Sequence, residues 1–250
     1  TMDFRFSEDQ SSIQELSRKI FESEVSEESL KALSKSKDSV HQKVWEALGQ
    51  AELLGIALPV EYGGGGMGLV ELGILLKEQG RVAAPIPLMH SSGVAAMTIA
   101  KFGDEALKGR LLRQVASGES VITSALAQST NVNFLKPEVQ ARADGDGYLL
   151  SGSNTCVASL QNADWVIVPA STANGQVGLF LVNPKDAGVR VESQTTTSFE
   201  EQGELTLEAV KVSAENLVGE LTEDGSQIQW MVERMWACIC ALQWGIAERQ

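Results

Sequence analysis

The first part of the chain carries apolar residues at helical spacing. Ile13, Leu16 and Ile20 recur every three or four positions behind a capping-box pattern at Ser7 to Gln10. Similar apolar stripes, or nearly continuous apolar runs, follow at 44–54, 69–80, 92–102 and 104–115. The pattern predicts a bundle of helices that ends near residue 117.

The hydrophobic pattern changes after Gly118, where apolar residues begin to alternate with polar ones. Such alternation flanks the Asp-Gly-Asp-Gly sequence at 144–147, which predicts a β-hairpin. Further short strands are expected at 165–169, 178–182, 189–193, 205–207 and 210–212. Many short strands at this spacing favour a small β-barrel or β-sandwich over residues 118–222.

The helical period returns at Ser226 and continues to the end of the sequence. This last helix is apolar on nearly every side, and such a helix must be covered by other protein. We therefore expect more chain or another subunit to pack on it. The pattern divides the chain into a helical domain (1–117), a β-domain (118–222) and the first helix of an incomplete helical domain (223–250).

Composition excludes several classes of protein. The 33 acidic and 20 basic residues give a net charge of -13, which disfavours binding to nucleic acid. Three cysteines are too few for a disulfide framework, and Cys238 and Cys240 are expected on different sides of a helix, so a cytoplasmic location is expected. The longest apolar stretch, 235–247, is too short to span a membrane.

Candidate chemistry is sparse in the sequence taken by itself. His41 and His90 have no partners at metal-binding spacing, so they are expected to be surface or packing residues and no metal site is predicted. Glycines 63, 65 and 68 match the GxGxxG pattern of dinucleotide sites, but no βαβ pattern surrounds them. We interpret this glycine cluster as a sharp turn between two helices.

Two longer motifs carry a resemblance to a known family. The segment 45–69 contains a Trp, a Leu-Gly step and Pro-Val-Glu-Tyr-Gly-Gly, and it continues to Glu-Gln-Gly-Arg at 78–81. The segment 210–219 is similar to a strand and exit loop that close a β-domain. Together they closely resemble the acyl-CoA dehydrogenases. The resemblance implies an α+β fold with an N-terminal α-helical bundle, a middle antiparallel β-barrel or sandwich and the start of a C-terminal helical domain.

The resemblance also implies an FAD-dependent enzyme that dehydrogenates an acyl-CoA thioester to its α,β-enoyl form. In the family, one flavin-contacting segment is written roughly Ala-Leu-Thr-Glu-Pro and another Trp-Ile-Thr-Asn. The first aligns with 125–129, so Leu126 and Ala127 are candidate flavin contacts, and Ser129 and Asn133 are candidate substrate contacts. A threonine hydroxyl of the family pattern is missing at Ala127.

The second flavin segment aligns with 156–159 and makes Cys156, Val157 and Ala158 candidate flavin contacts. Cys156 replaces an aromatic residue, and Ala158 lacks another hydroxyl of the family pattern. Cys156 is interpreted either as a replacement in the flavin pocket or as a small buried apolar residue. Backbone groups at 126–127 and 157–158 could still contact the flavin edge, and the alternative is a β-domain that only packs.

The family's catalytic base is carried by some members near the start of the first C-terminal helix, where Glu233 and Arg234 align. An apolar neighbourhood would raise the pKa of the Glu233 carboxyl, and Arg234 would orient its surroundings. The alternative is an ordinary glutamate on a solvated helix face. Other members carry the base later in the chain.

Two functions remain open at this point. The first is an FAD-dependent acyl-CoA dehydrogenase that forms an oligomer and passes electrons to an electron-transfer flavoprotein. The second is a non-catalytic subunit of the same family that partners an active paralogue in a hetero-oligomer. The positions that depart from the family pattern favour the second: Ala127, Gln128, Ser129, Cys156 and Ala158. Glu233 and Arg234 favour the first.

Overall fold

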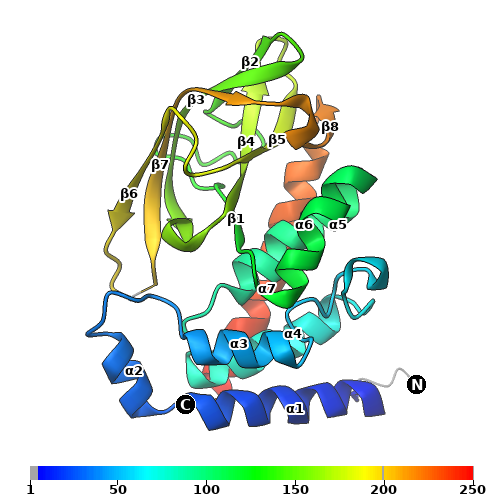
Figure 1. Ribbon diagram of the computed structural model, residues 1–250, viewed down its shortest axis with the longest axis vertical. Coiled ribbons are helices and arrows are strands. Elements are labelled where there is room, and N and C mark those ends of the chain that lie inside the picture. The colour runs from blue at the N-terminus through cyan, green and yellow to red at the C-terminus, as the bar shows by residue number, and fades with distance from the viewer. Residues whose placement is uncertain (1–4, 199, 250) are drawn as a thin grey trace.

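The computed structural model describes residues 5–198 and 200–249. Figure 1 shows a helical part at one end and a curved sheet at the other, with α7 (Ser226–Arg249) running along both. The helical part contains α1 (Glu8–Glu24), α2 (Glu27–Leu33), α3 (Gln42–Gln50), the 3-10 turn η1 (Val60–Tyr62), α4 (Leu69–Val82), the π-helical segment η2 (Met89–Ala95), α5 (Ala96–Phe102) and α6 (Glu105–Ser117).

The predicted helices are confirmed, with one addition. The capping box forms at α1, where the Ser7 hydroxyl accepts from the Gln10 N–H at 3.1 Å and the Gln10 side chain accepts from the Ser7 N–H at 3.0 Å. The sequence pattern missed α2 because this seven-residue helix buries none of its residues and so has no apolar stripe. Helix α3 ends at Gln50, earlier than expected, and Glu52 follows with a left-handed φ of 58°.

The glycine cluster is the structural turn that was expected. A side chain at Gly64 would place its Cβ atom 2.1 Å from the carbonyl oxygen of Leu58, so only glycine fits there. Gly63 has a φ of 80°, which favours glycine for a second reason. The turn therefore folds back on the segment before it and leads into α4.

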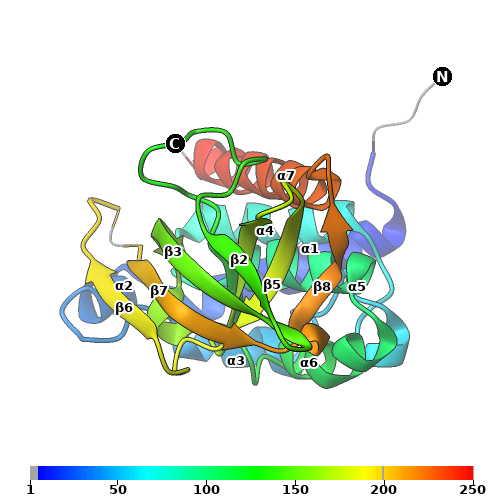
Figure 2. The same cartoon turned by 90° about the horizontal axis from the view of Figure 1, so that it is seen from above.

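The middle of the chain forms one eight-stranded sheet. Its strands are β1 (Ile122–Ser124), β2 (Gln140–Asp144), β3 (Gly147–Ala158), β4 (Trp165–Thr172), β5 (Val177–Val182), β6 (Val189–Gln194), β7 (Gln202–Val212) and β8 (Leu217–Thr222). They follow the order β6-β7-β3-β2-β4-β5-β8, with β1 paired to β4. The predicted hairpin is β2–β3 (Figure 2).

The expected antiparallel barrel or sandwich needs correction in two respects. The sheet is mixed, because β1 and β2 both run parallel to β4. Its two end strands, β6 and β8, have no pairing with each other among the described residues, so it is an open curved sheet and not a closed barrel. β1 pairs with residues 165–167 of β4 and β2 with residues 171–172, so the 15-residue loop at 125–139 joins two strands that run in the same direction along β4.

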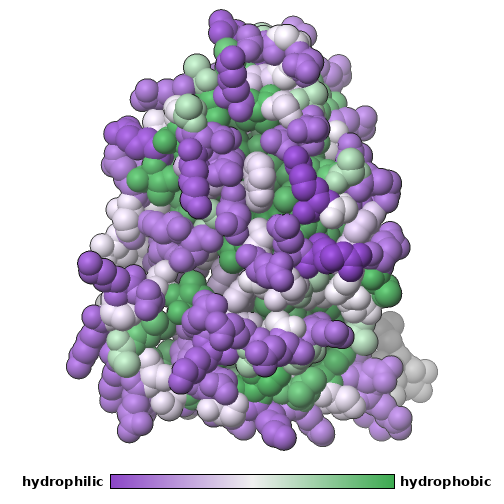
Figure 3. All heavy atoms as spheres, viewed as in Figure 1, coloured by the Kyte–Doolittle hydropathy of each residue, from purple (hydrophilic) through white to green (hydrophobic). Residues whose placement is uncertain are grey.

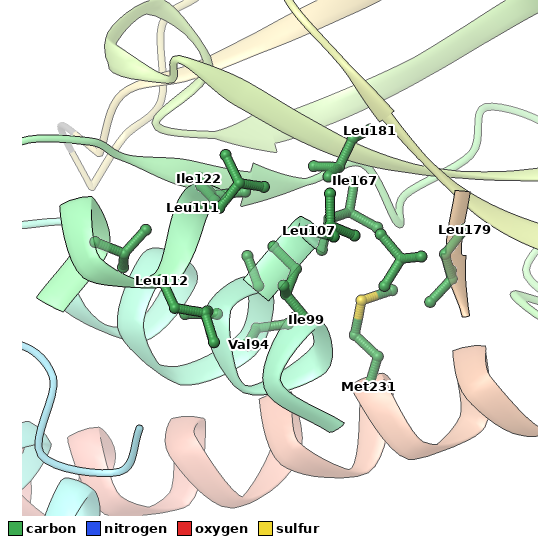
Figure 4. Packing of buried hydrophobic residues seen from close by; sticks show 14 of the residues in the cluster. Val94, Ile99, Leu107, Leu111, Leu112, Ile122, Ile167, Leu179, Leu181 and Met231 are labelled. Atoms are coloured by element: carbon green, nitrogen blue, oxygen red, sulfur yellow. The ribbon is translucent and has the colours of Figure 1, made fainter. Parts of the chain in front are cut away.

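The helices and the sheet share a continuous apolar core (Figure 4). Ile167, Leu179 and Leu181 of the sheet pack in one buried cluster with α5, α6 and Met231 of α7 (Ser226–Arg249). Two other clusters lie within the helical part and within the sheet. Division of the chain at residues 117 and 222 stays a prediction.

Helices α4 and α7 approach each other at two glycines. A Cβ atom at Gly245 would lie 1.8 Å from the carbonyl oxygen of Lys77, and one at Gly80 would lie 2.1 Å from that of Leu242.

Along α7, Cys238 is buried and Cys240 is exposed, as the helical spacing predicted. No helix among the described residues is long and apolar enough to cross a membrane. On the face shown in Figure 3, apolar residues form only separate patches among polar ones.

A buried carboxylate joins α1 to α4. The Glu78 side chain is fully buried and accepts hydrogen bonds from Arg18 at 3.0 and 3.1 Å and from Arg81 at 2.8 Å. Arg81 also pairs with Glu22 at 2.6 Å. Burial alone would raise the pKa of Glu78, but the hydrogen bonds and charges of Arg18 and Arg81 outweigh it and leave the pKa lowered.

Replacing Glu78 by Gln is expected to lower the free energy of unfolding by about 2 kcal/mol at neutral pH, because charged hydrogen bonds to two arginines are lost. A carboxyl whose pKa is lowered by folding stabilises the protein above its unfolded pKa and loses this effect as the pH falls. The variant should therefore lose less stability than the parent when the pH falls below about 4.5. Urea unfolding at several pH values measures this. Glu15→Gln on the exposed face of α1 is the control, and equal pH dependence in parent and Glu78→Gln would contradict the assignment.

Candidate functional site

The two segments predicted to contact flavin lie side by side. The Asn154 side-chain NH2 donates to the carbonyl oxygens of Ala125 and Ala127, both at 3.1 Å, and the Thr155 N–H also donates to Ala127 at 3.2 Å. The loop after β1 is thereby fixed against the end of β3. The structure thus brings together the segments 125–129 and 156–159, which lie about thirty residues apart in the chain.

The end of β3 is irregular at the candidate flavin residues. The pairing of β3 with β7 shifts register between Asn154 and Val157, and Cys156 has a left-handed φ of 52°. A non-glycine residue in this conformation costs about 1 kcal/mol, and such strained positions cluster at functional sites. Because of this irregularity, the backbone of Cys156 lies outside the regular pairing of β3 with β7.

Gln194 holds this irregular backbone in place, and sequence analysis missed it. Its side-chain oxygen accepts from the Cys156 N–H at 3.0 Å, and its side-chain nitrogen donates to the Thr155 hydroxyl at 3.0 Å. Gln194 is the last residue of β6, and nothing in its local sequence distinguishes it. Only the pairing of strands places it beside Cys156.

The side chains of the candidate flavin residues differ in exposure. Val157 and Ala158 are buried, Leu126 is half-buried, and Ala127 and Cys156 are exposed. The interpretation of Cys156 as a small buried apolar residue is therefore wrong, because the left-handed turn directs it outward. The other interpretation, a replacement in a flavin pocket, stays a prediction.

Backbone groups at the first segment suit a planar ring with polar edges. Within the described part of the chain, the N–H groups of Leu126 and Ala127 take part in no hydrogen bond. The Ala158 carbonyl, in contrast, is already engaged by the Thr123 hydroxyl at 2.7 Å. Free donors at 126–127 fit the acceptor edge of an isoalloxazine ring, which needs no particular side chain from the protein.

The loop after β1 reaches across to α7, as Figure 2 shows. Phe134 packs edge-to-face on Trp236 with ring centroids 6.1 Å apart. Ser129 and Asn133, the candidate substrate contacts, are exposed on this loop, and the Asn133 side chain accepts from the Leu135 N–H at 3.1 Å. The loop therefore places both residues on the side of the molecule where the first turns of α7 lie.

The candidate base lies on the exposed face of α7. The Glu233 side chain is 48% exposed and bonds to Gln229 at 3.0 Å and to Arg234 at 3.2 Å. Arg234 stacks over the Trp230 ring at 4.3 Å. The apolar surroundings expected for Glu233 are therefore not supplied by the described residues, while the orienting contact from Arg234 is present. The catalytic role of both residues stays a prediction.

A cavity of about 690 Å³ adjoins the candidate flavin segment. Ser159, the residue after Ala158, lines it together with Gln79 of α4 and Leu242 and Ile246 of α7. Cavities of this size hold small molecules or cofactors. The site therefore contains both a flat, partly exposed backbone surface and a hollow large enough for an organic ligand.

The two histidines make different contacts. His41 is buried, and one of its ring nitrogens lies 3.2 Å from the Ser29 hydroxyl. His90 pairs with Glu200 at 3.2 Å. Among residues 5–198 and 200–249, no group of three His, Cys, Asp or Glu side chains could hold a metal ion.

Comparison with known proteins identifies the family. A family model described as the N-terminal domain of acyl-CoA dehydrogenases matches residues 7–119. Acyl-CoA dehydrogenase FadE27 of Mycobacterium tuberculosis is 31% identical over 249 residues, which cover 99% of this chain and 64% of that protein. FadE12 of the same organism is 30% identical over 199 residues, 75% of this chain and 51% of that protein.

Solved structures agree with the sequence relatives. The ChsE4-ChsE5 complex from Mycobacterium tuberculosis superposes with a TM-score of 0.91 at 31% identity, covering 99% of this chain and 66% of the matched chain. A variant of the Tcur3481-Tcur3483 steroid ACAD has a TM-score of 0.88 at 35% identity, covering 97% and 64%. The chain thus spans between 51% and 66% of the length of these relatives. On its sequence motifs, its fold and these matches, the chain belongs to the acyl-CoA dehydrogenase family.

Proposed function

We propose that this chain forms the helical, strand and first C-terminal-helix parts of an FAD-dependent acyl-CoA dehydrogenase. The observation that carries the proposal is the joining of segments 125–129 and 156–159 by Asn154 and Thr155, next to a cavity lined by Ser159. Bound FAD would accept a hydride from the β-carbon of the acyl group. An electron-transfer flavoprotein is the proposed acceptor of the electrons.

The residues of this chain would bind and position the reactants. The N–H groups of Leu126 and Ala127 would donate to the polar edge of the flavin, and the Val157 and Ala158 backbone would support it. Glu233 would remove the α-proton of the thioester, and Arg234 would hold that carboxylate in place.

The second candidate is a non-catalytic subunit that works with an active paralogue. Two observations favour it. Residues Ala127, Cys156 and Ala158 lack the family's hydroxyl and aromatic groups. Similar structures include the ChsE4-ChsE5 complex, which contains two different proteins. In this case the protein would stay colourless alone, and flavin would be taken up only after mixing with the partner.

FAD binding is tested by restoring a missing hydroxyl. Ala127→Thr is expected to tighten FAD binding about fivefold, because one added hydrogen bond contributes about 1 kcal/mol. Ala127→Val has the same shape without the hydroxyl and is the matched control. Ala127 is exposed, so neither change strains the core. Titration with FAD, followed by the visible flavin bands, measures the affinity.

The outcomes separate the two candidates. Flavin bands in the parent protein, with tighter binding in Ala127→Thr than in Ala127→Val, support the dehydrogenase. A protein that stays colourless with excess FAD, in the parent and in both variants, contradicts it and leaves the non-catalytic subunit. Equal affinities for the two variants would show that position 127 does not face the flavin.

A further inference from the structure

The side chain of Gln128 joins several parts of the loop between β1 and β2. Its NH2 group donates toward the carbonyl oxygens of Asn131 at 3.2 Å, Asn133 at 3.3 Å and Lys136 at 3.5 Å. Its Oε1 atom accepts from the Glu138 N–H at 2.5 Å. The surroundings therefore set the orientation of this amide, since its nitrogen faces carbonyl oxygens and its oxygen faces an N–H group.

Both ends of this loop are attached to strands of the sheet. Its start, the segment 125–127, is held by the side chain of Asn154 on β3. At its end, the Ser171 hydroxyl of β4 donates to the Pro137 carbonyl at 2.8 Å. The hydrogen bond that Gln128 accepts comes from the residue directly after Pro137, so it joins the two attached ends to each other.

The middle of the loop contacts the helix that carries the candidate base. Phe134 packs on Trp236 of α7, and Trp236 follows Glu233 by three residues, which places both on one side of the helix. The loop thus connects the candidate flavin segment to the part of α7 around Glu233. Because Gln128 ties the loop to its own start, it influences how these two parts of the site lie.

The family pattern has a glutamate where this chain has Gln128. An ionised carboxylate at this position could still accept from the Glu138 N–H, but it has no hydrogen to donate. Its second oxygen would face the three carbonyl oxygens that now receive the amide, and contacts between acceptors are unfavourable. The observed loop therefore requires a neutral donor at position 128 and disfavours an ionised acid.

We propose that Gln128 is a positioning residue of the candidate flavin site. It holds the loop in one shape and so fixes the backbone at 126–127, whose free N–H groups then need no ordering when flavin binds. The change from the family's glutamate is compensated by the loop, and it no longer favours a non-catalytic subunit. The inference rests on the proposed function, because flavin is the ligand for which the segment is held ready.

Two variants separate hydrogen bonding from charge at this position. Gln128→Glu introduces the family's residue and a negative charge, whereas Gln128→Met has a similar length but no charge and no donor. Both should weaken FAD binding about fivefold or more, because each removes the hydrogen bonds that order the loop. Gln50→Glu, at an exposed position on α3, is the control for charge and should bind FAD as the parent does.

Titration with FAD, followed by the visible flavin bands, measures these affinities. Weakening in both Gln128 variants supports the proposal. Weakening in Gln128→Glu alone would assign the effect to charge and overturn the role of the hydrogen bonds. Weakening in Gln128→Met alone would overturn the need for a neutral donor, and unchanged affinity in both would overturn the proposal as a whole.

Hydrogen–deuterium exchange measures the loop without flavin. In both Gln128 variants the amides of 129–138 should exchange about tenfold faster or more than in the parent, because the loop opens more often. The melting temperature should stay close to the parental value, since most of residues 129–136 are exposed and outside the core. Faster exchange throughout the protein with a lower melting temperature would show a general structural role, and unchanged exchange in the loop would overturn the proposal.

Failure of this proposal is distinguishable from failure of the proposed function. A protein that takes up no FAD, but whose loop loosens in both variants, keeps the ordering of the loop by Gln128 and loses the dehydrogenase. A protein that takes up FAD equally well in the parent and in both variants keeps the dehydrogenase and loses Gln128 as a positioning residue.

Discussion

Gly245→Ala is expected to lower the free energy of unfolding by about 3 kcal/mol. The new methyl group would lie 1.8 Å from the Lys77 carbonyl oxygen, which belongs to the backbone of α4 and cannot rotate away. In an isolated helix the same change would stabilise the helix by about 1 kcal/mol. A net loss of stability in the protein would therefore show that the steric contact between α4 and α7 outweighs this gain. Thermal or urea unfolding followed by circular dichroism measures it.

Gly109→Ala on α6 is the matched control. A Cβ atom at this exposed helical glycine meets nothing within 4 Å, so the change should stabilise the protein by about 0.5–1 kcal/mol. Opposite signs for the two variants would establish that close packing of α4 and α7 is required. A stable Gly245→Ala protein would mean that α7 can shift on α4 without loss, contrary to the structure.

Glu233→Gln is expected to slow the bleaching of bound flavin by an acyl-CoA substrate about 10³-fold, if the protein is the proposed dehydrogenase. The amide keeps the shape of the side chain but cannot accept the α-proton, and a positioned base contributes 10²–10⁴ in rate, on the order of 10³. Stopped-flow absorbance of the flavin band measures the rate. FAD affinity should not change, because Glu233 is placed as the base and not as a flavin contact.

The matched control for this variant is Glu223→Gln. Glu223 is an exposed glutamate just before α7, outside the candidate site, and its replacement should leave bleaching unaltered. If Glu233→Gln also bleaches at the parental rate, the base lies elsewhere, as it does in the family members that carry it later in the chain. In that case Glu233 is an ordinary surface residue bonded to Gln229 and Arg234.

Most of the helices and strands could be predicted from local sequence. Capping at Ser7, the glycine turn at 63–66 and the Asp-Gly-Asp-Gly hairpin depend on short-range steric and hydrogen-bonding preferences, and the structure confirms them. Helix α2 could not be predicted, because it buries no residue and therefore leaves no periodic pattern. The two predicted strands at 205–207 and 210–212 form one strand, β7, in which Ala209 takes a left-handed φ of 50°.

The candidate site shows where sequence reasoning stops. Motif alignment found segments 125–129 and 156–159, because each resembles a family pattern along the chain. It could not find Gln194 or the hydrogen bonds of Gln128, whose importance comes from the atoms beside them in the fold. The exposure of Cys156 could not be predicted either, because the left-handed turn at this residue lies where the pairing of β3 with β7 changes register.

The sequence by itself determined the family, the order of helices and strands, and the candidate residues Leu126, Ala127 and Glu233. These features depend on neighbouring residues in the chain and on the spacing of motifs, and both can be read directly from the sequence. The tertiary structure alone decided that the sheet is mixed and open, that Glu233 faces outward, and that distant segments enclose the cavity at Gln79. Strand partners, exposure and cavity walls are set by residues far apart in the chain, and no local pattern records those contacts.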